Sequence, residues 1–84
     1  MANAAGEPYV VHADWDDEAG VWVASSDDVP GLVTGADTLE ALVEKLRVMV
    51  PEMLELNGVL SAEAAAQARF KLIAERVEQA RAVA

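Results

Sequence analysis

Two apolar segments in the first third of the chain are rich in β-branched and aromatic residues, which are typical of β-strands. Residues 9–15 form the first such segment, and residues 21–25 form the second. Between them, residues 16–20 are polar and end in glycine, which suits a hairpin loop. With a short strand over residues 32–36, the pattern predicts an antiparallel meander of three strands. On the first strand, one face carries Tyr9, Val11, Ala13 and Trp15, and the other carries Val10 and His12.

A turn separates the second and third predicted strands, and a helix start follows the third. Val29-Pro30-Gly31 ends one element, because proline fixes φ and lacks an N–H, whereas glycine accepts backbone angles that other residues avoid. Asp37 is followed three residues later by Glu40, a capping-box pattern with Asp in place of Ser or Thr. We therefore expect a helix to begin at Asp37 or Thr38.

This helix is the most strongly predicted element of the chain. Its apolar residues recur at spacings of three and four, which places them on one side of a helix. Pro51 interrupts the pattern and predicts a kink, because proline removes one backbone hydrogen bond. Asn57-Gly58 is a typical helix end, so the helix is expected to continue to about Asn57. The apolar stripe consists of Leu39, Leu42, Val43, Leu46, Met49, Val50, Met53 and Leu54.

The C-terminal segment allows two interpretations. Residues 61–84 are rich in Ala, Glu, Gln and Arg, which favours a helix with Phe70, Ile73 and Val77 on one side. Against a helix, residues 70–77 partly alternate, and the first strand of the meander has an open edge. A strand that follows a crossover helix can pair parallel to that edge. We expect a linker with one helical turn over residues 61–68 and then a strand over residues 70–79, which gives the strand order third, second, first, fourth.

Four stretches follow one another along the chain: Trp15-Asp16, Gly20-Val21-Trp22-Val23-Ala24, Ser26-Asp27-Asp28-Val29-Pro30-Gly31-Leu32 and Ala36-Asp37-Thr38-Leu39-Glu40-Ala41-Leu42. Their order and spacing resemble the HicB-like antitoxin domain, and more closely an uncharacterised sister family of short stand-alone bacterial proteins. The resemblance covers residues 9–57 well and the C-terminal quarter loosely. It implies an α+β, partial RNase H-like fold of the order β-β-β-α-β, with three antiparallel strands, one kinked helix on one face and a C-terminal strand parallel to the first. For the better-known members, it implies a non-catalytic domain that neutralises a small RNA-cleaving toxin.

The length of the chain suits one small domain with a thin core. A chain of this size buries about 60–65% of its unfolded surface, and 17 of its 84 residues are alanine. We expect residues 1–7 to be disordered and residues 8–84 to form a single HicB-like domain. The N-terminus lacks the features of a signal peptide, and no apolar run approaches the ~20 residues of a membrane span. Together with the absence of cysteine, these observations favour a cytoplasmic protein with no membrane partner.

Charge narrows the class of partner. The formal net charge is −9, and residues 1–37 contain eight acids and no Lys or Arg. This argues against direct nucleic-acid binding, which requires cations that face phosphates, and it favours a basic protein partner or solubility alone. Many full-length HicB-like antitoxins carry a C-terminal DNA-binding segment, whereas this chain ends near its last predicted strand. The basic residues Arg69, Lys71, Arg76 and Arg81 are interspersed with Glu75 and Glu78, which we interpret as an ion-paired strand.

Two sets of carboxylates suggest metal binding at first sight. The acids of residues 14–18 fail the EF-hand pattern, because Ala19 replaces the tight-turn glycine and Ser25 replaces the bidentate glutamate. An RNase H-like nuclease would need carboxylates from the first strand, the helix and the last strand around two metal ions. The candidates by position are Asp14, Glu40 or Glu44, and Glu75. Each has a simpler structural explanation, and the single histidine lacks a nucleophile pattern, so we expect no catalytic residue, metal or cofactor.

The sequence therefore predicts a non-enzymatic protein-interaction module, a HicB-like antitoxin that masks the RNA-binding surface of a small basic, HicA-like toxin. The expected partner-binding residues are the loop acids Asp16, Asp17, Glu18, Asp27 and Asp28. A homodimer or higher even-numbered oligomer is also expected, because one helix can cover one sheet face. Its expected interface residues are Trp22, Val10 and His12. The alternatives are a repurposed structural homo-oligomer and a metal-dependent nuclease.

Overall fold

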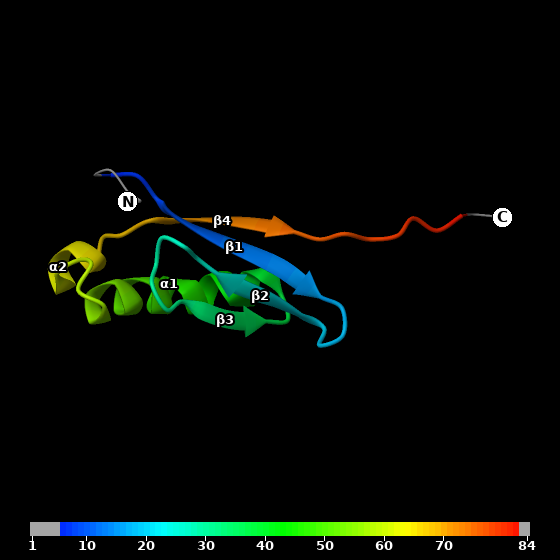
Figure 1. Ribbon diagram of the computed structural model, residues 1–84, viewed down its shortest axis with the longest axis horizontal. Coiled ribbons are helices and arrows are strands. Elements are labelled where there is room, and N and C mark those ends of the chain that lie inside the picture. Colours follow the sequence, from blue (N-terminus) through cyan, green and yellow to red (C-terminus); the bar gives the residue numbers. More distant parts are fainter. Residues whose placement is uncertain (1–5, 83–84) are drawn as a thin grey trace.

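One long helix lies across one face of a four-stranded sheet (Figure 1). The computed structural model describes residues 6–82, so most of the segment expected to be disordered, residues 1–7, lies outside the described residues. The predicted α+β class and order of elements are confirmed. The elements are β1 (Tyr9–Asp16), β2 (Val21–Ser25), β3 (Val33–Ala36), α1 (Leu39–Leu56), α2 (Ala62–Ala65) and β4 (Phe70–Glu75).

The strand order is β3-β2-β1-β4, as predicted. β1 runs antiparallel to β2, with Trp15 opposite Trp22, and parallel to β4, with Tyr9 opposite Phe70. The C-terminal segment is therefore a strand, although it ends at Glu75 and not near residue 79. β1 ends at Asp16, two residues past the register partner of Glu75, and turns into the hairpin, so residues 78 and 79 have no strand beside them.

The start of α1 differs from the prediction by one residue. The N-cap is Thr38, whose extended backbone lets its Oγ1 accept a hydrogen bond from the Ala41 N–H at 3.0 Å. Asp37 lies one residue too early for this role. The helix continues through Pro51 to Leu56, one residue before the predicted end.

The core lies between α1 and the sheet face that we call the inner face. Because side chains alternate along a strand, β1 contributes Val11 and Ala13 to this face, and β2 contributes Ala24; all three are 0% exposed. Ala13 and Ala24 are also register partners, and their small side chains leave room for the helix. The helix buries four residues of the predicted stripe: Leu42, Leu46, Val50 and Leu54.

The opposite side of the sheet, which we call the open face, has no helix over it (Figure 1). It carries the alternate residues of each strand, among them His12 of β1, Val23 of β2 and Val33 of β3. Val23 is 38% exposed and Val33 is 67% exposed. Neither helix of residues 6–82 has the length and apolar character needed to cross a membrane.

Candidate functional site

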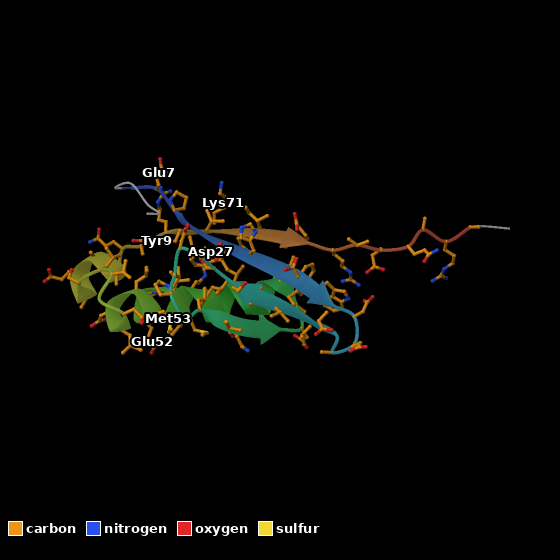
Figure 2. The ribbon with its side chains drawn as sticks, viewed as in Figure 1. Glu7, Tyr9, Asp27, Glu52, Met53 and Lys71 are labelled. Atoms are coloured by element: carbon orange, nitrogen blue, oxygen red, sulfur yellow. The ribbon has the colours of Figure 1, made fainter. Side chains whose placement is uncertain are left out.

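The five acids expected to bind a partner fall into two groups at opposite ends of the sheet. Asp16, Asp17 and Glu18, which we call the acidic hairpin, connect β1 to β2, whereas Asp27 and Asp28 follow β2. The two groups are separated by the five residues of β2, about 17 Å at 3.4 Å per residue. Asp27 accordingly lies far from the hairpin in Figure 2. The structure therefore does not unite these acids in one surface.

The acidic hairpin is held in a defined conformation. The Asp16 Oδ1 accepts hydrogen bonds from the backbone N–H of Glu18 at 3.0 Å and of Ala19 at 3.2 Å. The Gly20 N–H closes the loop by donating to the Asp16 carbonyl at 2.8 Å. Gly20 has φ +69°, a value that favours glycine. The carboxylates of the hairpin are thus presented to solvent from a fixed backbone.

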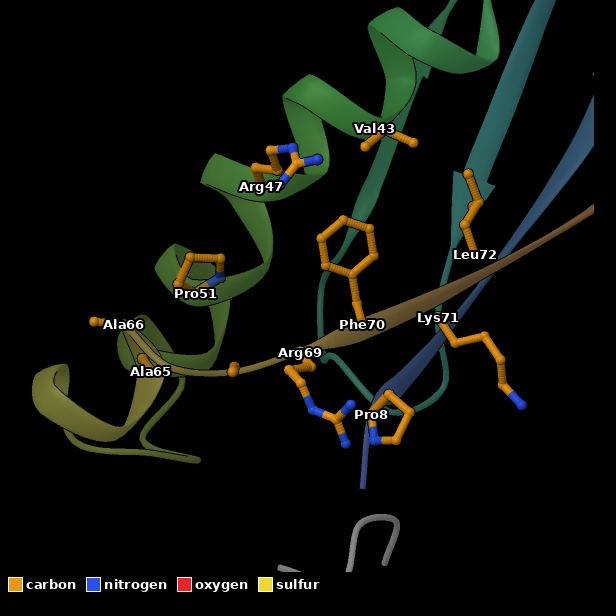
Figure 3. Close-up of a pocket in the computed structure, with 11 residues that line it drawn as sticks. Pro8, Val43, Arg47, Pro51, Ala65, Ala66, Arg69, Phe70, Lys71 and Leu72 are labelled. Carbon is orange, nitrogen blue, oxygen red and sulfur yellow. The ribbon is translucent and has the colours of Figure 1, made fainter. Parts of the chain in front are cut away.

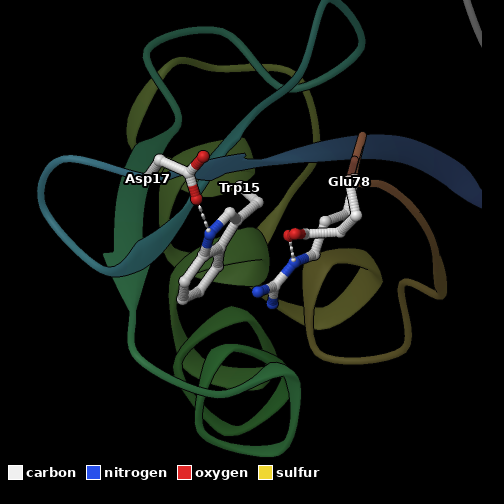
Figure 4. A network of polar contacts seen from close by, with 4 residues as sticks. Trp15, Asp17 and Glu78 are labelled. Atoms are coloured by element: carbon white, nitrogen blue, oxygen red, sulfur yellow. Dashed lines mark hydrogen bonds and ion pairs between the residues drawn. The ribbon is translucent and has the colours of Figure 1, made fainter. Parts of the chain in front are cut away.

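A cluster around Trp15 joins the hairpin to the C-terminal residues (Figure 4). The Trp15 Nε1 donates a hydrogen bond to Asp17 Oδ1 at 2.7 Å, and the Trp15 ring packs edge-on against Trp22 with 5.4 Å between centroids. The Arg76 guanidinium lies 4.0 Å from the Trp15 ring centroid and binds Glu78. Because a cation over an indole face is attracted by the ring, Arg76 holds the chain after β4 against the hairpin end of the sheet.

Asp28 has a structural role that sequence reasoning missed. Its Oδ2 accepts a hydrogen bond from the Val10 N–H at 2.8 Å, and the Ser26 Oγ donates to the Val10 carbonyl. Ser26 also accepts hydrogen bonds from the N–H groups of Asp28 and Val29. These side chains replace the ladder bonds that β2, which ends at Ser25, would otherwise give to β1. Asp28 is half-buried, whereas Asp27 is exposed.

Replacing Asp28 by alanine is expected to lower the free energy of unfolding by about 1–3 kcal/mol, because the Val10 N–H loses its acceptor in a half-buried position. Urea unfolding measures this loss. The matched control is Asp27→Ala, which changes the same charge at an exposed position and is expected to stay within about 0.5 kcal/mol of the wild type. Equal losses in the two variants would contradict the structural role of Asp28.

The three residues expected at an oligomer interface lie on different faces. Val10 and His12 lie on the open face, where His12 is exposed. Trp22 lies on the inner face and is 8% exposed, so it does not share a face with Val10 and His12. The reason is its register with Trp15, because residues opposite each other in a sheet share a face. Contact of any of the three with another chain stays a prediction.

The carboxylates considered for a nuclease do not converge. Asp14 and Glu75 are register partners on the open face. Glu40 and Glu44 are exposed on α1, which packs on the inner face, and Glu44 contacts Arg47 at 3.4 Å. Within residues 6–82, no three or more His, Cys, Asp or Glu side chains are grouped closely enough to hold a metal ion. The arrangement thus offers no constellation for metal-assisted hydrolysis in the described part of the chain.

A groove of about 740 Å³ opens between α1 and β4 (Figure 3). Apolar groups of Val43, Pro51, Phe70 and Leu72 line it together with alanines of the α2 region. Arg47, Arg69 and Lys71 stand around it, and Arg69 also donates to the Gly6 carbonyl. Of the basic residues in the C-terminal segment, Arg69 and Lys71 therefore lie at this groove, and Arg76 lies in the Trp15 cluster. Sequence reasoning missed the groove, because the residues that line it come from segments that are far apart in the sequence.

Comparisons with known proteins agree with this fold. A solved structure, described as a hypothetical protein TTHA1013 from the extremely thermophilic bacterium Thermus thermophilus, is 51% identical in sequence. The match covers 89% of this chain and 99% of that chain, with a TM-score of 0.66. No curated protein gives a significant match. The model of a domain of unknown function, DUF1902, matches residues 8–84, so the chain belongs to the DUF1902 family.

Proposed function

We propose that this protein is a non-enzymatic protein-interaction module of the HicB-like antitoxin kind, whose acidic hairpin binds a small basic protein. The observation that carries the proposal is the exposed, conformationally fixed group Asp16, Asp17 and Glu18 at one end of the sheet. The partner suggested by the resemblance is a HicA-like toxin. Binding would cover the basic surface with which such a toxin contacts RNA.

The charge distribution supports this mode of binding. The hairpin end of the sheet also carries Asp14 and Glu75 on the open face, and Arg76 at that end is already engaged by Glu78. The whole chain has a formal net charge of −9. A negative field of this kind attracts a cationic protein and speeds its association more than it sets the final affinity. The field is screened by salt, with a Debye length of about 10 Å at 0.1 M and 3 Å at 1 M.

A purely structural homo-oligomer is the second candidate. It is favoured by the exposed valines of the open face, Val23 and Val33, which have no cover within residues 6–82. In that case the acids of the hairpin would serve solubility alone.

The test is co-purification with the product of an adjacent small basic reading frame, followed by association kinetics. Asp16→Asn, Asp17→Asn and Glu18→Gln are combined in one variant, because the amide oxygens keep the acceptors for the loop and for Trp15. We expect the association rate to fall by about tenfold or more in this variant, and to fall in the wild type between 0.1 M and 1 M salt.

The matched control removes three exposed acids at the other end of the molecule, Glu52→Gln, Glu55→Gln and Glu63→Gln. The two variants have the same net charge. If both slow association equally, or if neither does, the hairpin is not the binding site. If no basic partner binds at all, the structural homo-oligomer replaces the antitoxin proposal.

A further inference from the structure

β4 is an edge strand whose outer side is unpaired in the described chain. Among residues 6–82, β1 is the one strand that pairs with it. The Tyr9 N–H donates to the Arg69 carbonyl at 2.8 Å, and backbone polar groups alternate between the two sides of a strand. Odd-numbered residues of this segment therefore face β1. The N–H and C=O groups of Phe70, Leu72 and Ala74 face outward, ready to pair with another strand.

The opposite edge of the sheet is protected. β3 is four residues long, and the Nζ of Lys45, on α1, donates to the Gly35 carbonyl that faces away from β2. A short edge strand with a lysine over it is a common way to prevent edge pairing. β4 is six residues long, and its outer side has no comparable cover in the described chain. The two edges are thus unequal, and β4 is the one suited to pairing.

The residues after β4 lengthen this open edge. Residues 77–82 continue in the direction of β4 and extend away from the rest of the fold (Figure 1), and Val77 is 93% exposed. The radius of gyration is 14.9 Å, whereas about 12 Å is expected for a compact chain of this length. A strand that pairs with the outer side of β4 would have room to continue along this segment.

The charges of β4 are self-complementary. In the sequence Lys71-Leu72-Ile73-Ala74-Glu75, a base and an acid stand at equal distances on either side of Ile73. Within the chain, Glu75 lies opposite Asp14 on the open face, and like charges opposite each other are unfavourable. An antiparallel second copy centred on Ile73 would place Lys71 of the partner subunit beside Glu75. That contact would offset the repulsion from Asp14.

We propose that two copies of this chain pair through β4, antiparallel and about a two-fold axis at Ile73, and join their sheets into one continuous sheet. The outward-facing Leu72 of each copy would exchange backbone hydrogen bonds with the outward-facing Ala74 of the partner subunit. Ile73 would meet its own copy as a pair without hydrogen bonds. Both helices lie on the same side, because the axis is perpendicular to the sheet. The acidic hairpins stay free, so the proposal does not rest on the proposed function.

A charge exchange tests the register. The wild type is expected to show twice the chain mass of 8.9 kDa in light scattering. Lys71→Glu and Glu75→Lys should each weaken dimerisation by about tenfold, because two attractive pairs become repulsive, and the double variant should restore it. Glu55→Lys, on the exposed side of α1, is the control and should leave the dimer unchanged. Circular dichroism checks that every variant is folded.

A cysteine at the axis tests the geometry independently. The chain has no cysteine, and Cα atoms of an antiparallel pair without hydrogen bonds lie about 4.5 Å apart, within reach of a disulfide. Oxidised Ile73→Cys should therefore run as a dimer on a non-reducing gel, whereas Val33→Cys on the β3 edge should not. A monomeric wild type, a dimer indifferent to the charge exchange, or cross-linking through Val33→Cys in place of Ile73→Cys would overturn the proposal.

Discussion

Replacing Leu46 by alanine is expected to lower the free energy of unfolding by about 3–5 kcal/mol. Leu46 is 0% exposed and lies in the middle of the buried stripe of α1. The alanine would leave a cavity between the helix and the sheet, and the small inner-face residues Ala13 and Ala24 cannot expand to fill it. For a domain of this size, the total stability is about 4–12 kcal/mol, so this single change removes a large share. Urea unfolding measures the loss.

The matched control for this prediction is Val48→Ala, two residues further along the same helix. Val48 is 63% exposed, so its truncation removes little buried surface and is expected to stay within about 0.5 kcal/mol of the wild type. A comparable loss in both variants would mean that the described side of α1 is not the one that packs on the sheet.

Local patterns predicted most of this fold. The helix stripe contained every buried residue of α1, because burial on one side of a helix imposes a spacing of three and four. The β-branched and aromatic residues of segments 9–15 and 21–25 identified β1 and β2. β4 required a different argument, because the composition of residues 61–84 favours a helix. The open edge of β1 was the reason to expect a strand. Between residues 61 and 68, α2 is the one helix that forms.

What the sequence did not predict depends on the register between strands. Trp22 alternates with its neighbours, but its pairing with Trp15 decides which face it occupies. In the sequence, Asp28 looks like any other loop acid. The hydrogen bond that it accepts from the Val10 N–H forms because β2 ends at Ser25, beside β1. The position of Arg76 also depends on register. Arg76 follows Glu75, whose register partner is Asp14, and it therefore lies beside Trp15. The local pattern of each segment, taken by itself, does not fix such a register.

Gly31→Ala is expected to lower the free energy of unfolding by about 2–3 kcal/mol. Gly31 has φ +79°, a left-handed conformation that costs other residues roughly 1–2 kcal/mol. A Cβ at this position would lie 2.8 Å from the Met53 Cε, so the Met53 side chain must also shift. The loop has little freedom to move away, because the Asn57 Nδ2 donates to the Pro30 carbonyl at 3.1 Å. The measurement is again urea unfolding.

Gly20→Ala separates the two causes of this loss. Gly20 has φ +69°, and a Cβ there would meet nothing within 4 Å, so this variant reports the backbone cost alone, about 1–2 kcal/mol. The additional loss in Gly31→Ala then measures the free energy cost of the close approach between the loop and α1. That approach holds the buried Val29 and Leu32 against the core. Equal losses would show that Met53 moves aside without cost. If Gly31→Ala left the free energy of unfolding unchanged, Gly31 would not adopt the left-handed conformation, and the turn before β3 would have another backbone geometry.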